Sequence, residues 1–341
     1  MNTEILRPTS SADFARAAAM IRSGALVAFP TETVYGLGAN GLDTAACACI
    51  YEAKGRPSDN PLILHIADLS MAYEIARKVP PTAAHLLTAF APGPLTVILP
   101  KAAHIPDIVT GGLATVGIRC PDHDVARKLI RAAGVPIAAP SANTSGRPSP
   151  TSAAMVYADM AGRIPLILDG GSCRLGVESA IVDCTEGDIV TILRPGAVTR
   201  EMIAAELPHI EVRMDAALMA ADEAPRAPGM KYTHYAPCAP LTVYVGTGTA
   251  VAAALREEIL RRTAAGERPA VIASNETLTV LRDIVPAAHT YNCGARGNHS
   301  AFASCLYDAL RHFDDMPVTS LIAEGTAAVG LGTAIMNRLR K

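Results

Sequence analysis

The sequence predicts an α/β fold, with helices packed on a twisted mixed β-sheet, followed by a smaller α/β domain. Half of the 341 residues are apolar, yet only 4% are aromatic, so the core would be built from aliphatic side chains, which suits helices on sheets. Short apolar runs alternate with helical periodicities along the chain. The length exceeds that of one average domain, which indicates about two.

The first 205 residues contain most of the predicted elements. Residues 11–21 have the pattern of a capped helix, and residues 25–29 form an apolar strand that ends at Pro30. Further helices are predicted at 44–54, 71–79 and 83–90, and strands at 62–66, 95–99, 116–119, 137–139, 166–169, 180–183 and 189–193. So many strands do not fit one simple β-α-β series, and a mixed sheet is therefore expected.

The remainder of the chain changes character. Residues 206–240 contain five prolines and little periodicity, which predicts an extended linker. A strand at 241–245, a helix at 249–264, a strand at 270–273 and a helix at 301–313 follow. This rhythm predicts a doubly wound, Rossmann-like C-terminal domain.

Composition and charge exclude several classes of protein. The apolar content excludes a disordered chain, and no run approaches the roughly 20 apolar residues of a membrane-spanning helix. The net charge is −2, and residues 1–205 and 206–341 are each nearly neutral, so a broad nucleic-acid-binding face is not expected. The eight cysteines contain no C-x-x-C pair. Together with the lack of a signal-peptide pattern, they predict reduced thiols and a cytoplasmic location.

Two glycine-rich segments partly match dinucleotide-binding loops. In Gly36-x-Gly38-x-x-Gly41 the segment Pro30–Tyr35 separates the glycines from the preceding strand, so tight turns are the favoured interpretation. Gly246-Thr-Gly248 directly follows a predicted strand and remains an alternative nucleotide loop. Cys120 is an alternative nucleophile, although no histidine partner is identifiable.

Two polar loops have the residue types that bind phosphate oxygens. Lys54 and Arg56 flank a glycine between a helix and Pro57, which suits an anion with several oxygens. The segment 140–150 supplies hydroxyls, an amide and Arg147. A basic helix end and a polar turn are the simpler alternatives.

Two further arginines, Arg119 and Arg194, lie at predicted strand ends. All five cations therefore lie at element ends, where α/β proteins build their sites. Taken alone, His65 is most simply a satisfied core histidine, and Glu178 is most simply a helix cap or a solvated charge. The pattern as a whole favours a phosphate substrate and catalysis by positioning and charge neutralisation.

Several motifs in order resemble the YrdC/Sua5 family, the L-threonylcarbamoyladenylate synthases of tRNA t6A biosynthesis. They are Phe29-Pro-Thr-Glu-Thr-Val-Tyr-Gly-Leu-Gly38, Lys54-Gly-Arg-Pro-Ser-Asp-Asn-Pro-Leu62, Pro140-Ser-Ala-Asn143 and Glu178-Ser-Ala-Ile-Val-Asp183 with Leu193-Arg-Pro-Gly196. The segment 228–237 and the C-terminal segment 330–340 are similar to the two-domain Sua5 type. The resemblance implies a YrdC-like catalytic domain at 1–205, a linker or lid at 206–240 and a Sua5 C-terminal domain at 241–341.

The resemblance also implies a reaction. L-threonine captures CO2 or bicarbonate, and the resulting carbamate attacks the α-phosphate of ATP to give threonylcarbamoyl-AMP and pyrophosphate. The product serves the t6A37 modification of ANN-decoding tRNAs. Arg119 would clamp the threonine carboxylate in a pocket with Thr33, His65, Ala139 and Ser179. The residues expected to hold ATP are Lys54, Arg56, Asn60, Thr115, Ser141, Asn143, Ser149, Arg194, His234 and Tyr235, with Lys54 and Arg56 also catalytic.

Partners and cofactor follow from the same resemblance. Mg2+ would arrive with ATP, without a protein cage, and the product would pass to the tRNA threonylcarbamoyl-transfer machinery. His234 and Tyr235 would belong to a lid over the nucleotide. An RNA-binding module is a second hypothesis, but near-neutral charge and few aromatics predict weak or absent direct tRNA binding. A carbamoyl-phosphate-dependent transferase is a third hypothesis, although such relatives usually carry extra domains.

Overall fold

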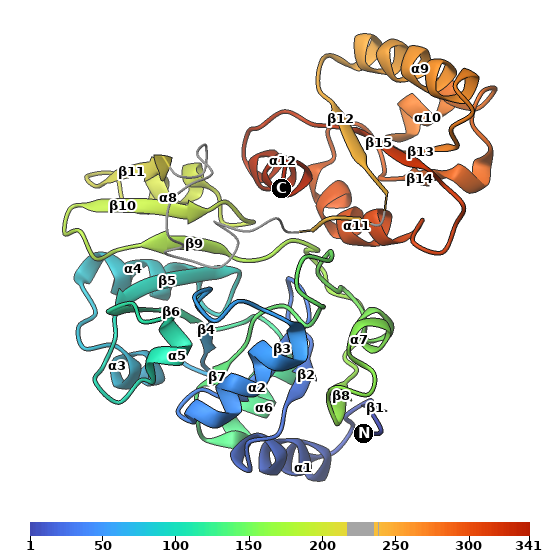
Figure 1. The fold of residues 1–341 in the computed structure, drawn as a ribbon. Coiled ribbons are helices and arrows are strands. Elements are labelled where there is room, and N and C mark those ends of the chain that lie inside the picture. Colours follow the sequence, from blue (N-terminus) through green and yellow to red (C-terminus); the bar gives the residue numbers. More distant parts are fainter. Residues whose placement is uncertain (217–234, 238) are drawn as a thin grey trace. The chain divides into compact units, whose positions relative to one another are not determined.

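The computed structural model describes residues 1–216, 235–237 and 239–341. These residues fall into two units, one made of residues 1–145 and 149–216 and the other of residues 146–148, 235–237 and 239–341. Each unit is described by itself below (Figure 1). None of the described helices is long and apolar enough to cross a membrane.

The first unit is a mixed α/β structure, which confirms the predicted fold class. Its elements, in chain order, are β1 (Glu4–Leu6), α1 (Ser11–Arg22), β2 (Val27–Phe29), β3 (Gly36–Asn40), α2 (Thr44–Lys54), β4 (Ile63–His65), α3 (Ser70–Ile75), α4 (Pro81–Phe90), β5 (Leu95–Pro100), α5 (Asp107–Thr110), β6 (Thr115–Arg119), α6 (Asp124–Ala133), β7 (Ile137–Ala138), α7 (Ala153–Met160), β8 (Leu166–Leu168), β9 (Ala180–Asp183), β10 (Ile189–Arg194), α8 (Arg200–Glu206) and β11 (Glu211–Met214).

The strands form one sheet in the order β1-β8-β2-β3-β7-β4-β6-β5-β9-β10-β11. Parallel and antiparallel pairs are mixed: β4 runs parallel to β6, whereas β5 and β6 are antiparallel. Figure 1 shows β9, β10 and β11 at one end of this sheet, with α8 beside β11. The order brings β4, β6, β5 and β9 together in the middle, although residues between them in the chain form five helices, α3 to α7.

The two faces of the sheet differ in what covers them. On one face, alternate strand residues such as Leu64, Val97 and Ile118 form a large core with α2, α3, α4, α7 and α8. On the other face, β2, β7 and β8 form a smaller core with α1 and α6. This difference follows from the two-residue side-chain period of strands, which directs neighbouring residues to opposite faces.

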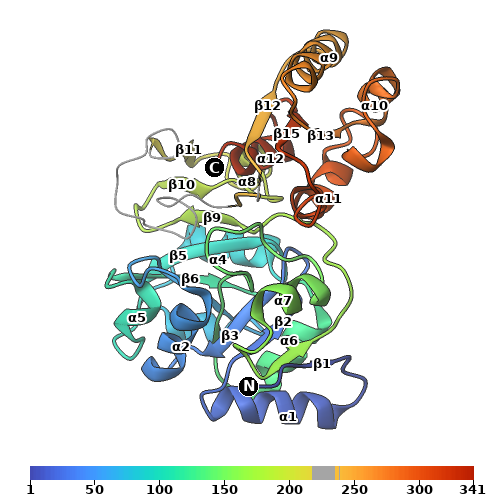
Figure 2. The same ribbon diagram turned by 45° about the vertical axis from the view of Figure 1, so that its right-hand side comes forward.

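The second unit is a small parallel sheet with helices. Its elements are β12 (Leu241–Tyr244), α9 (Gly248–Ala264), β13 (Pro269–Ala273), α10 (Asn275–Leu281), the 3-10 turn η2 (Ala287–His289), β14 (Thr290–Asn292), α11 (His299–Arg311), β15 (Ser320–Glu324) and α12 (Leu331–Leu339). The strand order is β12-β15-β13-β14, with every pair parallel. Figure 2 shows α9 near α10, and α11 near α12 on the other side of this sheet.

Three sequence interpretations differ from the structure. The helix predicted at 71–79 ends at Ile75, because the backbone N–H of Arg77 bonds the carbonyl of Pro100 on β5 instead. Gly36 and Gly38 lie within β3 and not in turns; a methyl group at Gly38 would lie 2.8 Å from Ile137 Cγ2. Residues Glu211–Met214, inside the predicted linker, form β11 against β10. The remaining domain boundaries stay a prediction.

Candidate active site

The candidate site lies on the face of the first sheet against which helices α1 and α6 pack. In the parallel register of β4 and β6, His65 is opposite Arg119, and His65 is also opposite Ile137 of the α1–α6 core. Side chains two residues apart in a strand point to the same face. Ile63 therefore lies on the face of His65, and Thr115 and Gly117 lie on the face of Arg119. Three of the sequence-predicted site residues therefore come from two neighbouring strands of one face.

The guanidinium of Arg119 is the central charge of this group. Its Nη2 atom donates to Thr33 Oγ1 at 2.9 Å and lies 2.8 Å from a carboxylate oxygen of Glu32. Arg119 is only 4% exposed, and Thr33 and Glu32 are buried. Both residues belong to the loop between β2 and β3. Thr33 and Arg119, both expected in the threonine pocket, are thus in direct contact, and Glu32 joins them without having been predicted as a site residue.

His65 is buried beside Arg119 at the end of β4. Burial, and secondly the positive charge of Arg119, lower the pKa of His65 to about 3. Its Nδ1 atom lies 3.2 Å from the carbonyl oxygen of Ile63, and its ring meets the Phe29 ring edge-on. The imidazole is therefore neutral at physiological pH and is suited to hydrogen bonding in a pocket without adding charge.

This lowered pKa predicts a stability effect in acid. Between pH 6.5, the usual pKa of histidine, and about 3, the unfolded chain binds one more proton at His65 than the folded chain. The free energy of unfolding should therefore fall by about 2 kcal/mol from pH 7 to pH 5 through this residue alone. Urea unfolding of wild type and His65→Asn at both pH values measures the difference.

The control for this experiment is His104→Asn, because His104 is exposed. That variant should retain the full pH dependence of the wild type. An equally steep loss of stability in His65→Asn would contradict a neutral, buried His65.

Lys54 anchors the second polar loop. It is the last residue of α2, which ends at Gly55 in the left-handed conformation that glycine favours. Its ammonium donates to the carbonyl of Ser141 at 2.5 Å and to the carbonyl of Asn143, and it is only 1% exposed. The Ser141 hydroxyl in turn donates to Asn143 Oδ1. Three predicted nucleotide residues from segments far apart in the chain are thus tied together.

Arg56 and Asn60 form a neighbouring pair in the loop after α2. The Arg56 guanidinium donates to the carbonyls of Asn60 and Pro61 at 3.3 and 3.1 Å. The side-chain oxygen Oδ1 of Asn60 is buried and has no hydrogen-bond partner among the described residues. A buried orphan acceptor is costly, so a ligand that donates a hydrogen bond there would relieve the cost.

Arg194 reaches the same face through an irregularity in its strand. The register of β10 against β9 shifts between Ile192 and Arg194, so that Arg194 lies opposite Ile181. Bulges commonly redirect a side chain in this way. Arg194 then donates to the carbonyl of Ser179 at 3.0 Å and to its hydroxyl at 3.2 Å.

Ser179 and Ser149 have partners that sequence reasoning missed. The Ser179 hydroxyl lies 2.8 Å from Thr96 Oγ1, and the Ser149 hydroxyl donates to Glu178 Oε1 at 2.5 Å. Glu178 is therefore a buried acceptor and not a solvated charge. Its position directly before Ser179 in a quoted motif was the signal available in the sequence.

An apolar depression lies beside these polar groups. It is lined by residues of the loop before β4, by β5, and by the start of β6, namely Pro61, Leu62, Ile63, Ile98, Leu113, Thr115 and Gly117. Gly117 keeps the floor open, because a methyl group there would lie 3.2 Å from Thr96 Cγ2. Thr115 lines this depression at the start of β6. Ala139 adjoins it through a backbone hydrogen bond to the Ile63 carbonyl.

Three other predicted residues either belong to the second unit or lie outside the described residues. His234 lies outside the described residues. Tyr235 has φ of 64° and stacks on Tyr307 within the second unit, with ring centroids 5.3 Å apart; its nucleotide role stays a prediction. Arg147 also belongs to the second unit and pairs with Asp314 there; its place at a phosphate site stays a prediction.

The alternative nucleophile is not supported. The Cys120 thiol is buried, and burial raises its pKa. A buried thiol with a raised pKa is a poor source of thiolate.

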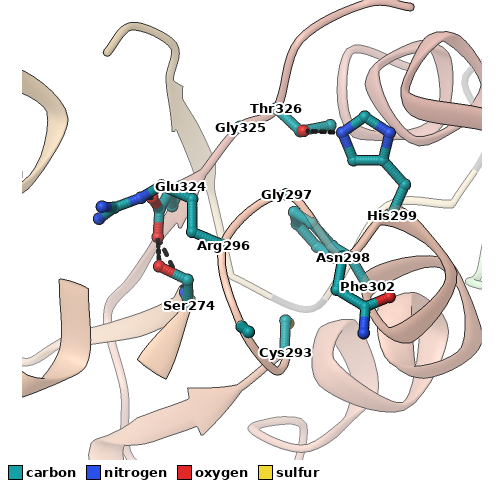
Figure 3. A pocket seen from close by; sticks show the side chains of 11 residues that line it. Ser274, Cys293, Arg296, Gly297, Asn298, His299, Phe302, Glu324, Gly325 and Thr326 are labelled. Carbon is teal, nitrogen blue, oxygen red and sulfur yellow. Dashed lines mark hydrogen bonds and ion pairs between the residues drawn. The ribbon is translucent and has the colours of Figure 1, made fainter. Parts of the chain in front are cut away.

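The second unit contains a pocket at the carboxyl ends of its parallel strands, drawn in Figure 3. Arg296 pairs with the buried Glu324 at 3.0 Å, which also accepts from the Ser274 hydroxyl, and His299 lies 2.7 Å from Thr326 Oγ1. A methyl group at Gly248 would lie 2.5 Å from the Arg296 guanidinium. The Gly246-Thr-Gly248 loop thus lies against the Arg296 guanidinium, and its role as an alternative nucleotide loop stays a prediction.

Fold and site together define a class: an α/β protein in which strand ends and loops of a mixed sheet carry buried cations, hydroxyls and amides. A family model described as "Telomere recombination", of the Sua5, YciO and YrdC proteins, matches residues 19–196. A second model, described as "Threonylcarbamoyl-AMP synthase, C-terminal domain", matches residues 198–341.

Full-length relatives agree with both models. The threonylcarbamoyl-AMP synthase of Bacillus subtilis is 48% identical over 334 residues, covering 98% of this chain and 93% of the relative. That of Pyrococcus abyssi is 46% identical, covering 95% and 92%. The crystal structure of P. abyssi Sua5 complexed with L-threonine matches with a TM-score of 0.92 and 43% identity, covering 100% of this chain and 97% of that one. The chain belongs to the YrdC/Sua5 family, in its two-domain Sua5 form.

Proposed function

We propose that this chain is an L-threonylcarbamoyladenylate synthase. It would condense L-threonine, bicarbonate or CO2, and ATP into threonylcarbamoyl-AMP and pyrophosphate, for the t6A37 modification of ANN-decoding tRNAs. The observation that carries the proposal is the buried Arg119–Thr33 contact, in a chain similar throughout its length to a Sua5 protein crystallised with L-threonine.

The threonine pocket is proposed around Arg119. A guanidinium binds a carboxylate through two parallel hydrogen bonds, so Arg119 would hold the threonine carboxylate. His65 is opposite Arg119 in the strand register, and Thr33 contacts Arg119 directly. Ser179 and the backbone of Ala139 would complete the pocket.

The nucleotide would lie between the polar loops and the apolar depression. Lys54, Ser141 and Asn143 form one connected group, and Arg56 with Asn60 forms another. These groups, with Ser149, Arg194 and Thr115, would bind the nucleotide. The unpartnered Oδ1 of Asn60 supports a donor from the nucleotide at that point.

The proposed chemistry needs position and charge neutralisation. A carboxylate oxygen of N-carboxythreonine attacks the α-phosphorus of ATP and forms the P–O bond, while the bond to the β-phosphate oxygen breaks and pyrophosphate leaves with that electron pair. Lys54 and Arg56 would stabilise the charge that develops on the phosphates. Binding N-carboxythreonine and ATP in one site would orient them for attack, which the same two molecules lack when they meet in water.

Metal ion, partners and lid complete the proposal. Mg2+ would be held by the ATP phosphates, as is common for this ion, and would neutralise part of the pyrophosphate charge. The product would pass to the tRNA threonylcarbamoyl-transfer machinery in the cytoplasm, and direct tRNA binding would be weak or absent. His234 and Tyr235 would close over the nucleotide and keep water from the labile product.

The test is pyrophosphate release from ATP, bicarbonate and Mg2+, with and without L-threonine. The full-length protein should release pyrophosphate only when threonine is present. Arg56→Ala should lower the rate by about 100-fold or more, because it removes a phosphate cation from the site. The matched control is Arg77→Ala, since Arg77 is exposed.

Pyrophosphate release that does not depend on threonine would refute the proposed function. Full activity of Arg56→Ala would remove only that residue from the site. Tight, salt-dependent tRNA binding would favour the RNA-binding hypothesis instead.

A further inference from the structure

Glu32 is a buried carboxylate that the proposed mechanism does not use. It precedes Thr33 in the loop between β2 and β3 and is only 2% exposed. The backbone carbonyl of Glu32 accepts from the N–H of Leu175, and that of Thr33 accepts from the N–H of Gly176. The loop is thus held at both residues, and the position of the Glu32 side chain is set by the fold.

The two carboxylate oxygens of Glu32 lack hydrogen-bond donors. Oε2 lies 2.8 Å from Arg119 Nη2, an ion-pair distance, but that nitrogen makes its aligned hydrogen bond to Thr33 Oγ1. Neither Oε1 nor Oε2 accepts a hydrogen bond from any residue that the structure describes. Buried carboxylates normally accept several hydrogen bonds, and leaving them unmade is costly.

The missing donors match one part of the proposed substrate. An α-amino acid carries an ammonium group with three N–H donors, one carbon away from its carboxylate. When the carboxylate binds Arg119, the amino group must lie within a few ångströms of it. Glu32 is in contact with the same guanidinium, so its oxygens lie within reach of that amino group.

We propose that Glu32 accepts hydrogen bonds from the amino group of the amino-acid substrate, while its charge balances Arg119. This inference rests on the proposed function. The Arg119–Glu32 pair is then complementary to a zwitterion, with one charge for each end of the α-amino acid. After carboxylation the nitrogen keeps one N–H, so the contact can persist while the carbamate reacts.

Specificity is the consequence that can be measured. A ligand without the amino group would leave Glu32 unsatisfied and would bind less well. A suitable probe is (R)-3-hydroxybutanoate, which keeps the carboxylate, hydroxyl and methyl groups of threonine and lacks only its nitrogen. We expect wild type to prefer L-threonine over this probe by about 10- to 100-fold, because a hydrogen bond to a charged group has that effect.

The decisive experiment compares both ligands by calorimetry in wild type, Glu32→Gln and Glu32→Asp. Glu32→Gln should reduce the preference for threonine at least about tenfold and leave affinity for 3-hydroxybutanoate nearly unchanged. Glu32→Asp, which keeps the charge on a shorter side chain, should recover part of the preference. In turnover, the Gln variant should raise KM for threonine more than it lowers kcat. Glu74→Gln is the control, since Glu74 is exposed.

Each outcome decides between the alternatives. If Glu32→Gln lowers the affinity for both ligands equally, the role of Glu32 is purely structural and the inference is overturned. An unchanged preference for threonine would also overturn it, because water would then satisfy Glu32. If Glu32→Gln does not fold, the wild-type preference and Glu32→Asp decide; no preference in wild type overturns the inference. If wild type neither binds threonine nor releases pyrophosphate with it, the proposed function itself fails.

Discussion

Replacing Arg119 with methionine is expected to abolish threonine-dependent pyrophosphate release and to destabilise the fold. Activity is lost because no other cation contacts Thr33 among the described residues, so the threonine carboxylate loses its partner. Stability falls by about 3–5 kcal/mol, because the change leaves Glu32 as an uncompensated buried charge. Urea unfolding and the pyrophosphate assay measure the two effects separately.

The double variant Arg119→Met/Glu32→Gln separates stability from function. Removing both charges should restore most of the free energy of unfolding, since no buried ion remains unpaired. The double variant should nevertheless stay inactive. Recovered activity would show that Arg119 does not hold the substrate, and a double variant as unstable as Arg119→Met would show that the pair is not coupled.

Replacing Lys54 with methionine is the second change with a large expected effect. Methionine has a similar shape but cannot donate to the Ser141 and Asn143 carbonyls. The end of α2 therefore loses its hydrogen bonds to the segment 140–150. Turnover should fall by at least about 100-fold through loss of a cation and of loop position. Stability should fall by about 1–3 kcal/mol, because the buried carbonyl of Asn143 and the half-buried carbonyl of Ser141 lose a donor.

The matched control is Lys101→Met. Lys101 also donates to a backbone carbonyl, that of Ile105 at 3.1 Å, but it lies outside the proposed site. Its loss should change stability slightly and leave kcat and KM unaltered. Wild-type turnover in Lys54→Met, measured by initial rates at saturating ATP and threonine, would place Lys54 in a structural role alone.

The sequence predicted the elements whose signals are local. The capped helix at 11–21 and the strands at 95–99 and 180–183 match α1, β5 and β9 closely, because capping residues and apolar runs are short-range patterns. Strand β3 was missed, since its sequence Gly-Leu-Gly-Ala-Asn resembles a turn. Its glycines are explained only by the close approach of Ile137 and Phe29 from neighbouring elements.

The candidate site shows the same division. The sequence predicts Arg119 and Arg194 at strand ends, but the face of the sheet that each side chain occupies depends on strand register. Arg194 reaches the face through a register shift against β9, and no sequence pattern reveals that shift. The loop composition groups Arg147 with these cations; the structure shows its ion pair with Asp314, and a role at the phosphate site stays a prediction.

By itself, the sequence determined the fold class, the family and the residue types of the site, because motifs and periodicities are properties of neighbouring residues. Only the tertiary structure decided that Glu32 lies against Arg119 with two unsatisfied oxygens. That contact joins a loop after β2 to the end of β6, and the burial that makes it costly arises only when the sheet has formed. Long-range register and desolvation are collective, so they are absent from any local stretch of sequence.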